Sequence, residues 1–230
     1  ETVNQSLQLQ WLKVENAPKV LGWILAAGSA ASLAAYGTIV LTWKTLGLSY
    51  DTVYMAAGAG TVLSAGVAWI AYPRWQAPTP QSRKMVLRRR YWLYYALQFL
   101  GGARRQIFIV FAAFMMVEKF GFTVPQVTTL FLVNYAANMM FAPLIGRMIQ
   151  RFGERTALVI EYVGLTGVFA AYAGIYLYDW GLWAAAALYV LDHLLFAMAY
   201  AQKTNFKKIS APADQSPTAA VAYTINHIES

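Results

Sequence analysis

Eight polar side chains stand inside long apolar stretches of this sequence, where they could bind a charged solute or carry a proton. They form four pairs: Arg104 and Arg105, Asn134 and Asn138, Asp192 and His193, and Asn226 and His227. A guanidinium group is planar, permanently charged and suited to bidentate binding of a carboxylate or phosphate, so the arginines could hold an anion. A buried carboxylate or imidazole could carry a proton, because burial can move its pKa into the working range.

Each of these residues also has a structural interpretation. The two arginines could form an internal ion pair with Asp192 or hydrogen bonds with the two asparagines. Asn134 and Asn138, four residues apart and therefore on one helix face, could instead join neighbouring helices. Asp192 could be a fixed counter-ion, and each histidine could be a buried, hydrogen-bonded group. The sequence leaves both interpretations open.

The apolar stretches around these residues are long enough to cross a membrane. Hydrophobic residues make up 59% of the 230-residue chain and charged residues 12%, about half the charged share of a typical soluble protein. A bilayer core about 30 Å thick needs about 20 apolar residues in a helix. Six runs reach that length: Val20–Trp43, Thr52–Tyr72, Tyr91–Val117, Phe122–Ile145, Thr156–Tyr178 and Trp180–Ala201, and a seventh begins near Ala219.

Because lipid offers no hydrogen-bond partner to the backbone, these runs should be helices. We therefore predict an all-α membrane bundle with six complete transmembrane helices and part of a seventh.

The four polar pairs fall at one depth of this predicted bundle. Arg104 and Arg105, for example, lie about fourteen residues into a 27-residue run, near mid-membrane at about 1.5 Å per residue. Polar groups at one level gather inward, because the alternative is lipid. We expect Arg104, Arg105, Asn134 and Asn138 to bind a solute, and Asp192, His193 and His227 to be candidates for proton coupling. Glu161 lies nearer the end of its run, where Arg155 or Arg151 could pair with it at the surface.

The basic residues are concentrated in every second loop between the predicted helices. Fourteen Lys and Arg residues fall on one side of the predicted helices and two, Lys44 and Lys119, on the other. Loops rich in Lys and Arg stay in the cytoplasm, so the start of the chain is expected to be cytoplasmic. We expect the membrane to be a bacterial cytoplasmic (inner) membrane.

Several function classes find no support in the sequence. The net charge of +8 is spread over short loops rather than clustered on a domain, so nucleic acid is not an expected partner. There is no cysteine, no Walker loop, no His-Glu-x-x-His and no Gly-x-Ser-x-Gly. We expect no cofactor, no metal and no enzymatic activity. The expected partners are the lipid bilayer and a small-molecule solute.

The residues after the fourth run carry a recognisable pattern. Gly146-Arg147-Met148-Ile149-Gln150-Arg151-Phe152-Gly153-Glu154-Arg155 resembles the loop signature Gly-x-x-x-Asp-Arg-x-Gly-Arg-Lys of the major facilitator superfamily (MFS). Gly146, Arg151 and Gly153 match that signature. Gln150 replaces the Asp and Glu154 replaces a basic residue, as is common in the second copy of the signature, between helices eight and nine.

The resemblance implies where the chain lies in such a protein. It places the six runs as helices five to ten of about twelve, followed by the start of helix eleven. Residues 1–72 would then end the first half-bundle, residues 73–90 would be a basic cytoplasmic linker, and residues 91–230 would belong to the second half-bundle. The remaining helices would belong to the same protein or to a larger membrane complex.

The sequence therefore supports two functional hypotheses. The first is a secondary active transporter (a symporter, if proton-coupled) of a small anionic organic solute, with Arg104 or Arg105 holding the anion. The alternative is a non-transporting membrane subunit or assembly factor that reuses the MFS fold, in which His193 and His227 could ligate haem or chlorophyll.

Overall fold

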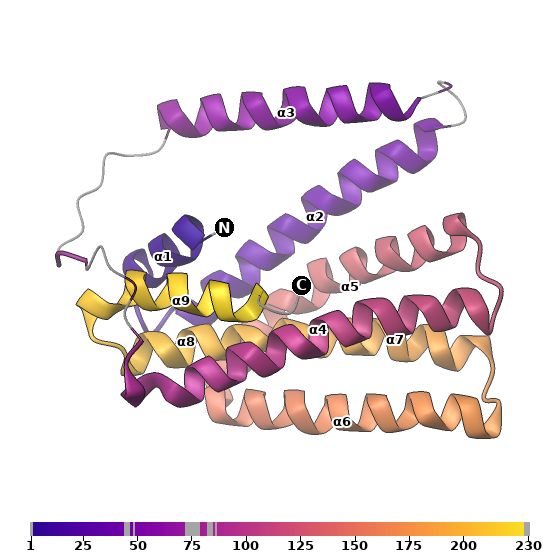
Figure 1. Ribbon diagram of the computed structural model, residues 1–230. Helices are drawn as coiled ribbons and strands as arrows, with labels where there is room; N and C mark the ends of the chain where they lie inside the picture. The colour runs from indigo at the N-terminus through magenta and orange to yellow at the C-terminus, as the bar shows by residue number, and fades with distance from the viewer. Residues whose placement is uncertain are drawn as a thin grey trace.

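The computed structural model describes residues 2–43, 47, 49–71, 79–81, 85 and 87–227, and this part of the chain is helical without strands (Figure 1). The elements in order are α1 Thr2–Trp11, α2 Ala17–Trp43, α3 Tyr50–Ala71, η1 Arg89–Tyr91, α4 Trp92–Glu118, α5 Val124–Phe152, α6 Glu154–Tyr178, α7 Leu182–Phe196, η2 Ala197–Ala199, α8 Tyr200–Ile209, η3 Pro212–Asp214 and α9 Gln215–His227, where η denotes a 3₁₀ helix.

The helices have the length and composition of membrane spans. Five stretches are long and apolar enough to cross a bilayer: α2, α3, α5, α6 and the continuous stretch from α7 to α8. Helix α4 is 27 residues long, and Arg104 and Arg105 interrupt its apolar sequence. The predicted all-α membrane bundle is confirmed. The short, polar helix α1 was not predicted, and most of the predicted linker, residues 73–90, lies outside the described residues.

Two helices run further than the apolar pattern predicted. Helix α5 continues past Ile145 to Phe152, so most of the predicted motif loop is helical, and the helix ends only at Gly153, where φ is +85°. Gly lacks a Cβ and adopts this φ without strain, so it is the natural stop. After Ala201 the chain continues as α8, which places Lys203 on a helix rather than in a loop.

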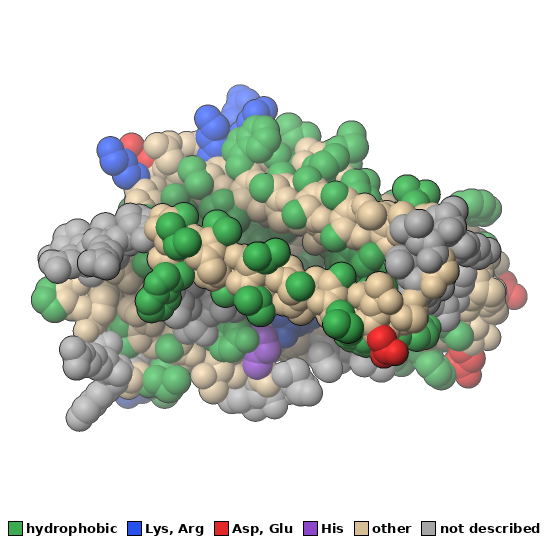
Figure 2. All heavy atoms as spheres, turned by 90° about the horizontal axis from the view of Figure 1, so that it is seen from above, with side chains coloured by type: hydrophobic (Ala, Val, Ile, Leu, Met, Phe, Trp, Pro, Cys, Tyr) green, Lys and Arg blue, Asp and Glu red, His purple; other side chains and the backbone are tan. Residues whose placement is uncertain are grey.

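The basic residues gather at one end of the bundle. The helices run back and forth along one direction, with α1, the start of α2 and the turn from α8 to α9 together at the same end (Figure 1). In Figure 2 the Lys and Arg side chains lie toward that end and most of the Asp and Glu side chains toward the other, with hydrophobic side chains spread between them. Helix α3 crosses apart from the others and has no buried residue.

Helices α2 and α5 touch backbone to backbone where two glycines meet. A Cβ added to Gly146 would lie 2.6 Å from the carbonyl oxygen of Pro18, and one added to Gly22 would lie 2.6 Å from that of Ala142. Small residues at such a crossing let membrane helices approach closely and pack by van der Waals contact. Gly146 therefore serves helix packing, and this crossing joins α2 to the rest of the bundle.

An apolar core fills the half of the bundle nearer the α4–α5 turn. It is built from α4, α6 and α7 and comprises Phe108, Ala112, Met115, Met116, Leu165, Val168, Tyr172, Ile175, Ala185, Tyr189 and Leu195. Polar side chains begin where this core ends, at Phe108. The packed core therefore forms one wall of the polar region described below.

We predict that Gly146→Ala destabilises the bundle, because the added methyl group cannot fit against the Pro18 carbonyl without moving α2 away from α5. Overpacking of this kind costs about 1–3 kcal/mol, which thermal unfolding of the purified protein in detergent would measure. Gly167→Ala is the control, since a Cβ added at Gly167 meets nothing within 4 Å. Equal stability of the two variants would contradict the close crossing.

Candidate functional site

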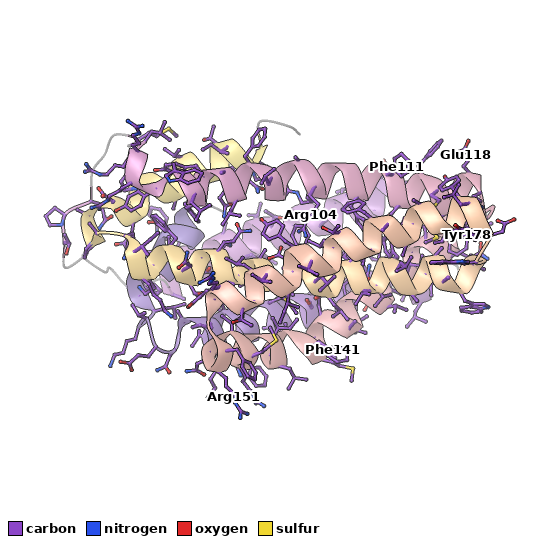
Figure 3. All side chains as sticks on the ribbon, turned by 90° about the horizontal axis from the view of Figure 1, so that it is seen from below. Arg104, Phe111, Glu118, Phe141, Arg151 and Tyr178 are labelled. Carbon is purple, nitrogen blue, oxygen red and sulfur yellow. The ribbon has the colours of Figure 1, made fainter. Side chains whose placement is uncertain are left out.

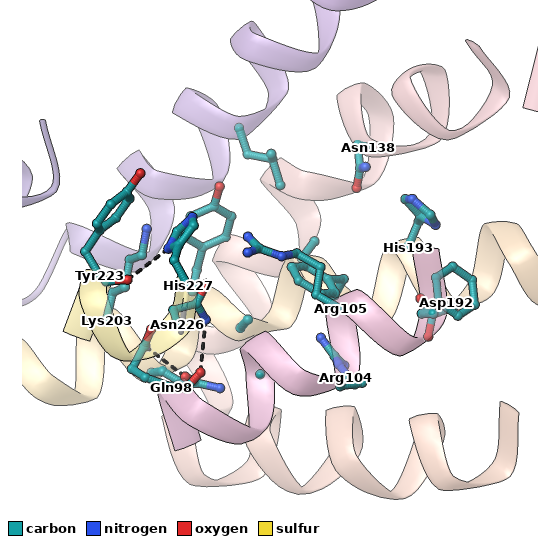
Figure 4. Close-up of a pocket in the computed structure, with 18 residues that line it drawn as sticks. Gln98, Arg104, Arg105, Asn138, Asp192, His193, Lys203, Tyr223, Asn226 and His227 are labelled. Carbon is teal, nitrogen blue, oxygen red and sulfur yellow. Dashed lines mark hydrogen bonds between the residues drawn. The ribbon is translucent and has the colours of Figure 1, made fainter. Parts of the chain in front are cut away.

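A cavity of about 380 Å³ opens between α2, α4, α5, α7, α8 and α9 (Figure 4). It is lined by Leu25, Gln98, Gly101, Arg104, Arg105, Phe108, Asn138, Asp192, His193, Phe196, Ala197, Ala199, Tyr200, Gln202, Lys203, Tyr223, Asn226 and His227. Six of the seven residues predicted to bind solute or carry a proton are in this set. Residues from four distant parts of the sequence therefore meet at one polar site within an apolar bundle.

The two adjacent arginines point in different directions. Successive residues on a helix project about 100° apart. Arg105 extends across the cavity toward α9 (Figure 4), and it forms no ion pair with any described residue. Arg104 lies about midway along the bundle, between Glu118 and Tyr178 at one end and Arg151 toward the other (Figure 3). Its guanidinium lies 3.5 Å from Glu161 and 4.4 Å from the ring centroid of Phe196.

The expected surface pairing of Glu161 with Arg155 or Arg151 is wrong. Glu161 is only 1% exposed, and its ion pair is with Arg104. Its position on α6 explains this, because Ala157, Glu161 and Leu165 are four residues apart and are all buried on one face. Both Arg151 and Arg155 are exposed instead. Glu161 is close to the end of its helix, which predicted a position at the membrane surface. The face of α6 on which it lies is buried, however, and this face brings it to Arg104.

Asp192 lies on the cavity wall without a direct ion pair. It is 2% exposed, and its Oδ1 atom has no hydrogen-bond partner in the part of the chain that the structure describes. The direct ion pair of Arg104 is with Glu161 instead, so Asp192 has no counter-ion in contact with it among the described residues. The carboxyl group of Asp192 faces a space that a solute or water could enter.

The two histidines are both anchored through Nδ1. His193 Nδ1 donates to the Tyr189 carbonyl at 3.2 Å, and His227 Nδ1 donates to the Tyr223 carbonyl at 2.8 Å. Each ring also contacts a tyrosine: the His227 ring stacks on Tyr223 with centroids 4.1 Å apart, and the His193 ring lies tilted against Tyr189 with centroids 4.8 Å apart. These bonds hold the imidazoles at the cavity wall and fix the tautomer with the hydrogen on Nδ1.

Only one of the two predicted asparagines reaches the cavity. Asn138 lines it, whereas Asn134, one turn away on α5, is 3% exposed and does not. The side-chain amide of Asn134 has no hydrogen-bond partner among the described residues. Of the two, Asn138 is the one placed to contact a solute.

Helix α9 reaches the site through a close contact with α4. A Cβ added to Gly102 would lie 2.5 Å from the carbonyl oxygen of Asn226. The Asn226 side chain donates to the Gln98 carbonyl at 2.9 Å. This contact brings His227 to the same cavity as the arginines of α4.

Three polar residues of the cavity were not predicted. Gln98 donates to Gln202 at 3.0 Å, and Gln202 donates to the Tyr162 hydroxyl at 3.3 Å. A signal for Gln98 was present, because Gln98, Gly101, Arg105 and Phe108 follow each other at spacings of three and four and share one helix face. Lys203, the third, follows the end of the predicted run Trp180–Ala201, so the apolar pattern alone places it outside the membrane helices.

The motif residues lie at the basic end of the bundle, away from the cavity. Gln150 donates to the Glu15 carbonyl at 2.8 Å, just before α2. Glu154 pairs with Lys208 at the end of α8 at 2.8 Å. Arg151 is exposed, with its guanidinium 5.5 Å from the ring centroid of Phe152. The two departures from the family signature therefore make bonds of their own, which tie α5 and α6 to neighbouring segments.

Asp214 forms a second ionic cluster at this end. It is 3% exposed and pairs with Arg88 at 2.8 Å and Arg90 at 2.9 Å, and it accepts a hydrogen bond from the Tyr91 hydroxyl at 3.0 Å. Burial alone would raise the pKa of this carboxyl, but the hydrogen bonds from Arg88 and Tyr91 and the two positive charges outweigh burial and lower the pKa. The cluster joins the segment before α4 to the turn before α9.

We predict that Asp214→Asn lowers the melting temperature at neutral pH and that this difference narrows in acid. A carboxyl whose pKa is lower folded than unfolded stabilises fully above its unfolded pKa of about 4, and the effect is lost as the pH falls through the folded value. Melting curves of both proteins from neutral to acidic pH would test this. Glu15→Gln, at an exposed carboxylate, is the control. A difference that is constant with pH would contradict the role of the Asp214 charge.

Comparison with known proteins agrees with the helical layout. The sequence profile described as Major Facilitator Superfamily matches residues 2–226. No curated protein and no solved structure matches the chain. The match covers the helices that form the cavity and every residue that lines it except His227.

Proposed function

Because the chain belongs to the Major Facilitator Superfamily, a family of membrane transporters, we propose that it is part of a secondary active transporter that moves a small anionic organic solute through the cavity. The observation that carries this proposal is Arg105. It is a permanent cation inside a polar cavity of an apolar bundle, and it meets no carboxylate among the described residues. A charge buried in a membrane is costly, so a cation that is kept there needs a function.

The charges around the cavity favour an anion. Three cationic side chains line it, Arg104, Arg105 and Lys203, together with one carboxylate, that of Asp192. Glu161 lies behind the wall and pairs with Arg104. The excess positive charge would be offset by a bound anion, and the low dielectric of the site would strengthen that attraction.

The size and polar groups of the cavity suit a small organic molecule. A volume of about 380 Å³ falls within the usual range for small-ligand sites, about 300–1,000 Å³. We assign Arg105 to the anionic group of the solute and Asn138 to its orientation, and we assign no solute contact to Asn134, which is buried outside the cavity. Asp192, with His193 or His227, is the proposed site of proton coupling.

The two halves of such a transporter would meet along α2. We assign residues 1–72 to the first half-bundle, residues 73–90 to the linker and residues 91–230 to the second half, with the basic end in the cytoplasm of a bacterial cell. Contacts across the proposed boundary gather at this end: Gly22 against Gly146, Gln150 to the Glu15 carbonyl, and Lys207 to the Leu9 carbonyl. They would close the cytoplasmic side and have to open in alternating access.

We predict that an anion raises the melting temperature of the purified protein and that Arg105→Ala removes the effect. A ligand that binds only the folded state stabilises it in a concentration-dependent way. Loss of a charge-assisted bond worth about 1.5–3 kcal/mol should weaken binding about tenfold or more. The probes are phosphate, citrate and glucose, measured by thermal shift on wild type, Arg105→Ala and the control Arg151→Ala, whose arginine is exposed at the basic end.

Stabilisation by phosphate or citrate that Arg151→Ala keeps and Arg105→Ala loses would support the proposal. Stabilisation by glucose alone, equal in all three proteins, would contradict the anionic solute. Equal stabilisation of Arg105→Ala and wild type by an anion would contradict the role given to Arg105.

A further inference from the structure

Three charged side chains from three helices lie at or directly behind the cavity wall. They are Arg104 of α4, Glu161 of α6 and Asp192 of α7, and the side chains of Arg104 and Glu161 are 11% and 1% exposed. Asp192 is 2% exposed. The charge of Arg104 acts on both carboxyl groups, and the charge of Asp192 acts on Glu161. One guanidinium is therefore shared by two buried carboxyl groups.

The charges of this triad do not balance if both carboxyl groups are ionised. One permanent positive charge would face two negative charges in a region of low dielectric. An uncompensated buried charge is strongly unfavourable, and two neighbouring carboxylates avoid it when one of them keeps its proton. The pair then titrates as a unit rather than as two separate groups.

The geometry decides which of the two carries the proton. Glu161 Oε1 lies 3.5 Å from Arg104 Nη1, so Glu161 has the counter-ion. Asp192 forms no ion pair with a described residue, and its buried Oδ1 atom has no hydrogen-bond partner there. Glu161 Oε2 likewise has no hydrogen-bond partner among the described residues, so the two groups differ in the ion pair with Arg104 and in their access to the cavity, which Asp192 lines and Glu161 does not. A proton on Asp192 can therefore exchange with the cavity.

Among the described residues, no cationic side chain other than Arg104 forms an ion pair with either carboxyl group. The titratable and charged side chains around the pair are Arg105 on α4, Tyr135 on α5, Tyr162 and Tyr172 on α6, Tyr189 and His193 on α7, and Lys203 on α8. Arg105 extends toward α9, away from Asp192 (Figure 4). The Nδ1 atom of His193 donates to the Tyr189 carbonyl rather than to Asp192.

We infer that Glu161 and Asp192 share the positive charge of Arg104 and retain one proton between them at neutral pH, held on Asp192 in this arrangement. Glu161 acts as a positioning residue for proton coupling. It pairs with the Arg104 guanidinium, which would otherwise pair with Asp192 and favour its ionised form. This role in coupling rests on the function proposed above, in which a proton on the cavity wall offsets the charge of an entering anion. The proton itself can be detected without any solute.

The test is infrared spectroscopy of the full chain in detergent at neutral pH, in H₂O and in D₂O. A protonated carboxyl group has a C=O stretching band that an ionised one lacks, and the band shifts on deuteration. We expect one such band in the wild type and its loss in Asp192→Asn. We also expect its loss in Glu161→Gln, although that variant keeps Asp192, because Arg104 is then free to pair with Asp192. Glu118→Gln, at an exposed carboxylate of α4, should keep the band.

Arg104→Gln provides a second, opposite readout. Without the shared cation both carboxyl groups should keep a proton, so the band should increase about twofold. Size-exclusion chromatography would confirm that each variant is folded before its spectrum is compared.

Two results would overturn the inference: no protonated carboxyl band in the wild type, or a band that persists unchanged in folded Glu161→Gln. The infrared spectra are recorded without solute, so the two proposals can fail separately. If no anion raises the melting temperature, the anion site is contradicted but the shared proton is not. If the infrared band is absent, the shared proton is contradicted but the anion site is not.

Discussion

Lipid provides neither a counter-ion nor a hydrogen-bond partner, and the arrangement of this protein follows from that constraint. Charged side chains placed in the middle of long apolar helices must turn toward one another. Arg104, Glu161 and Asp192 do so from three helices, and Arg105 turns into the cavity beside them. The backbone obeys the same constraint, because each described span is a helix that pairs its own N–H and C=O groups.

Close contacts between helices fix where these inward-facing polar side chains meet. Gly22 and Gly146 let α2 and α5 touch, which brings Leu25 of α2 to the cavity. Gly102 lets α9 lie against α4, so that Asn226 and His227 reach the cavity that the arginines line. The packed apolar core of α4, α6 and α7 fills the neighbouring half of the bundle. The polar cavity is the space that remains between these contacts.

The positions of the helices depend on local composition and could be predicted from the sequence. The direction in which each polar side chain points depends on how its helix is rotated in the bundle, and this could not be predicted. Long apolar runs identified the helices, and shared depth brought together Arg104, Arg105, Asn138, Asp192, His193 and His227. Depth alone placed Glu161 at the surface, although the spacing of Ala157, Glu161 and Leu165 puts it on the buried face. Both adjacent arginines line the cavity, and the rotation of α4 against its neighbours decides which of them also pairs with Glu161. The apolar pattern predicted that the last complete helix ends before Lys203, but the chain remains helical through Lys203 in α8.

The most direct test of a polar, anion-accepting cavity is thiol labelling, because the chain has no cysteine of its own and each variant carries a single reactive group. Asn138→Cys lies on the cavity wall, and Phe141→Cys replaces an exposed side chain of the same helix that points away from the bundle (Figure 3). With membrane-impermeant thiosulfonate reagents, Asn138→Cys should react and Phe141→Cys should not. The negatively charged reagent should label Asn138→Cys faster than the positively charged one. An unreactive Asn138→Cys, or faster labelling by the cationic reagent, would contradict the account.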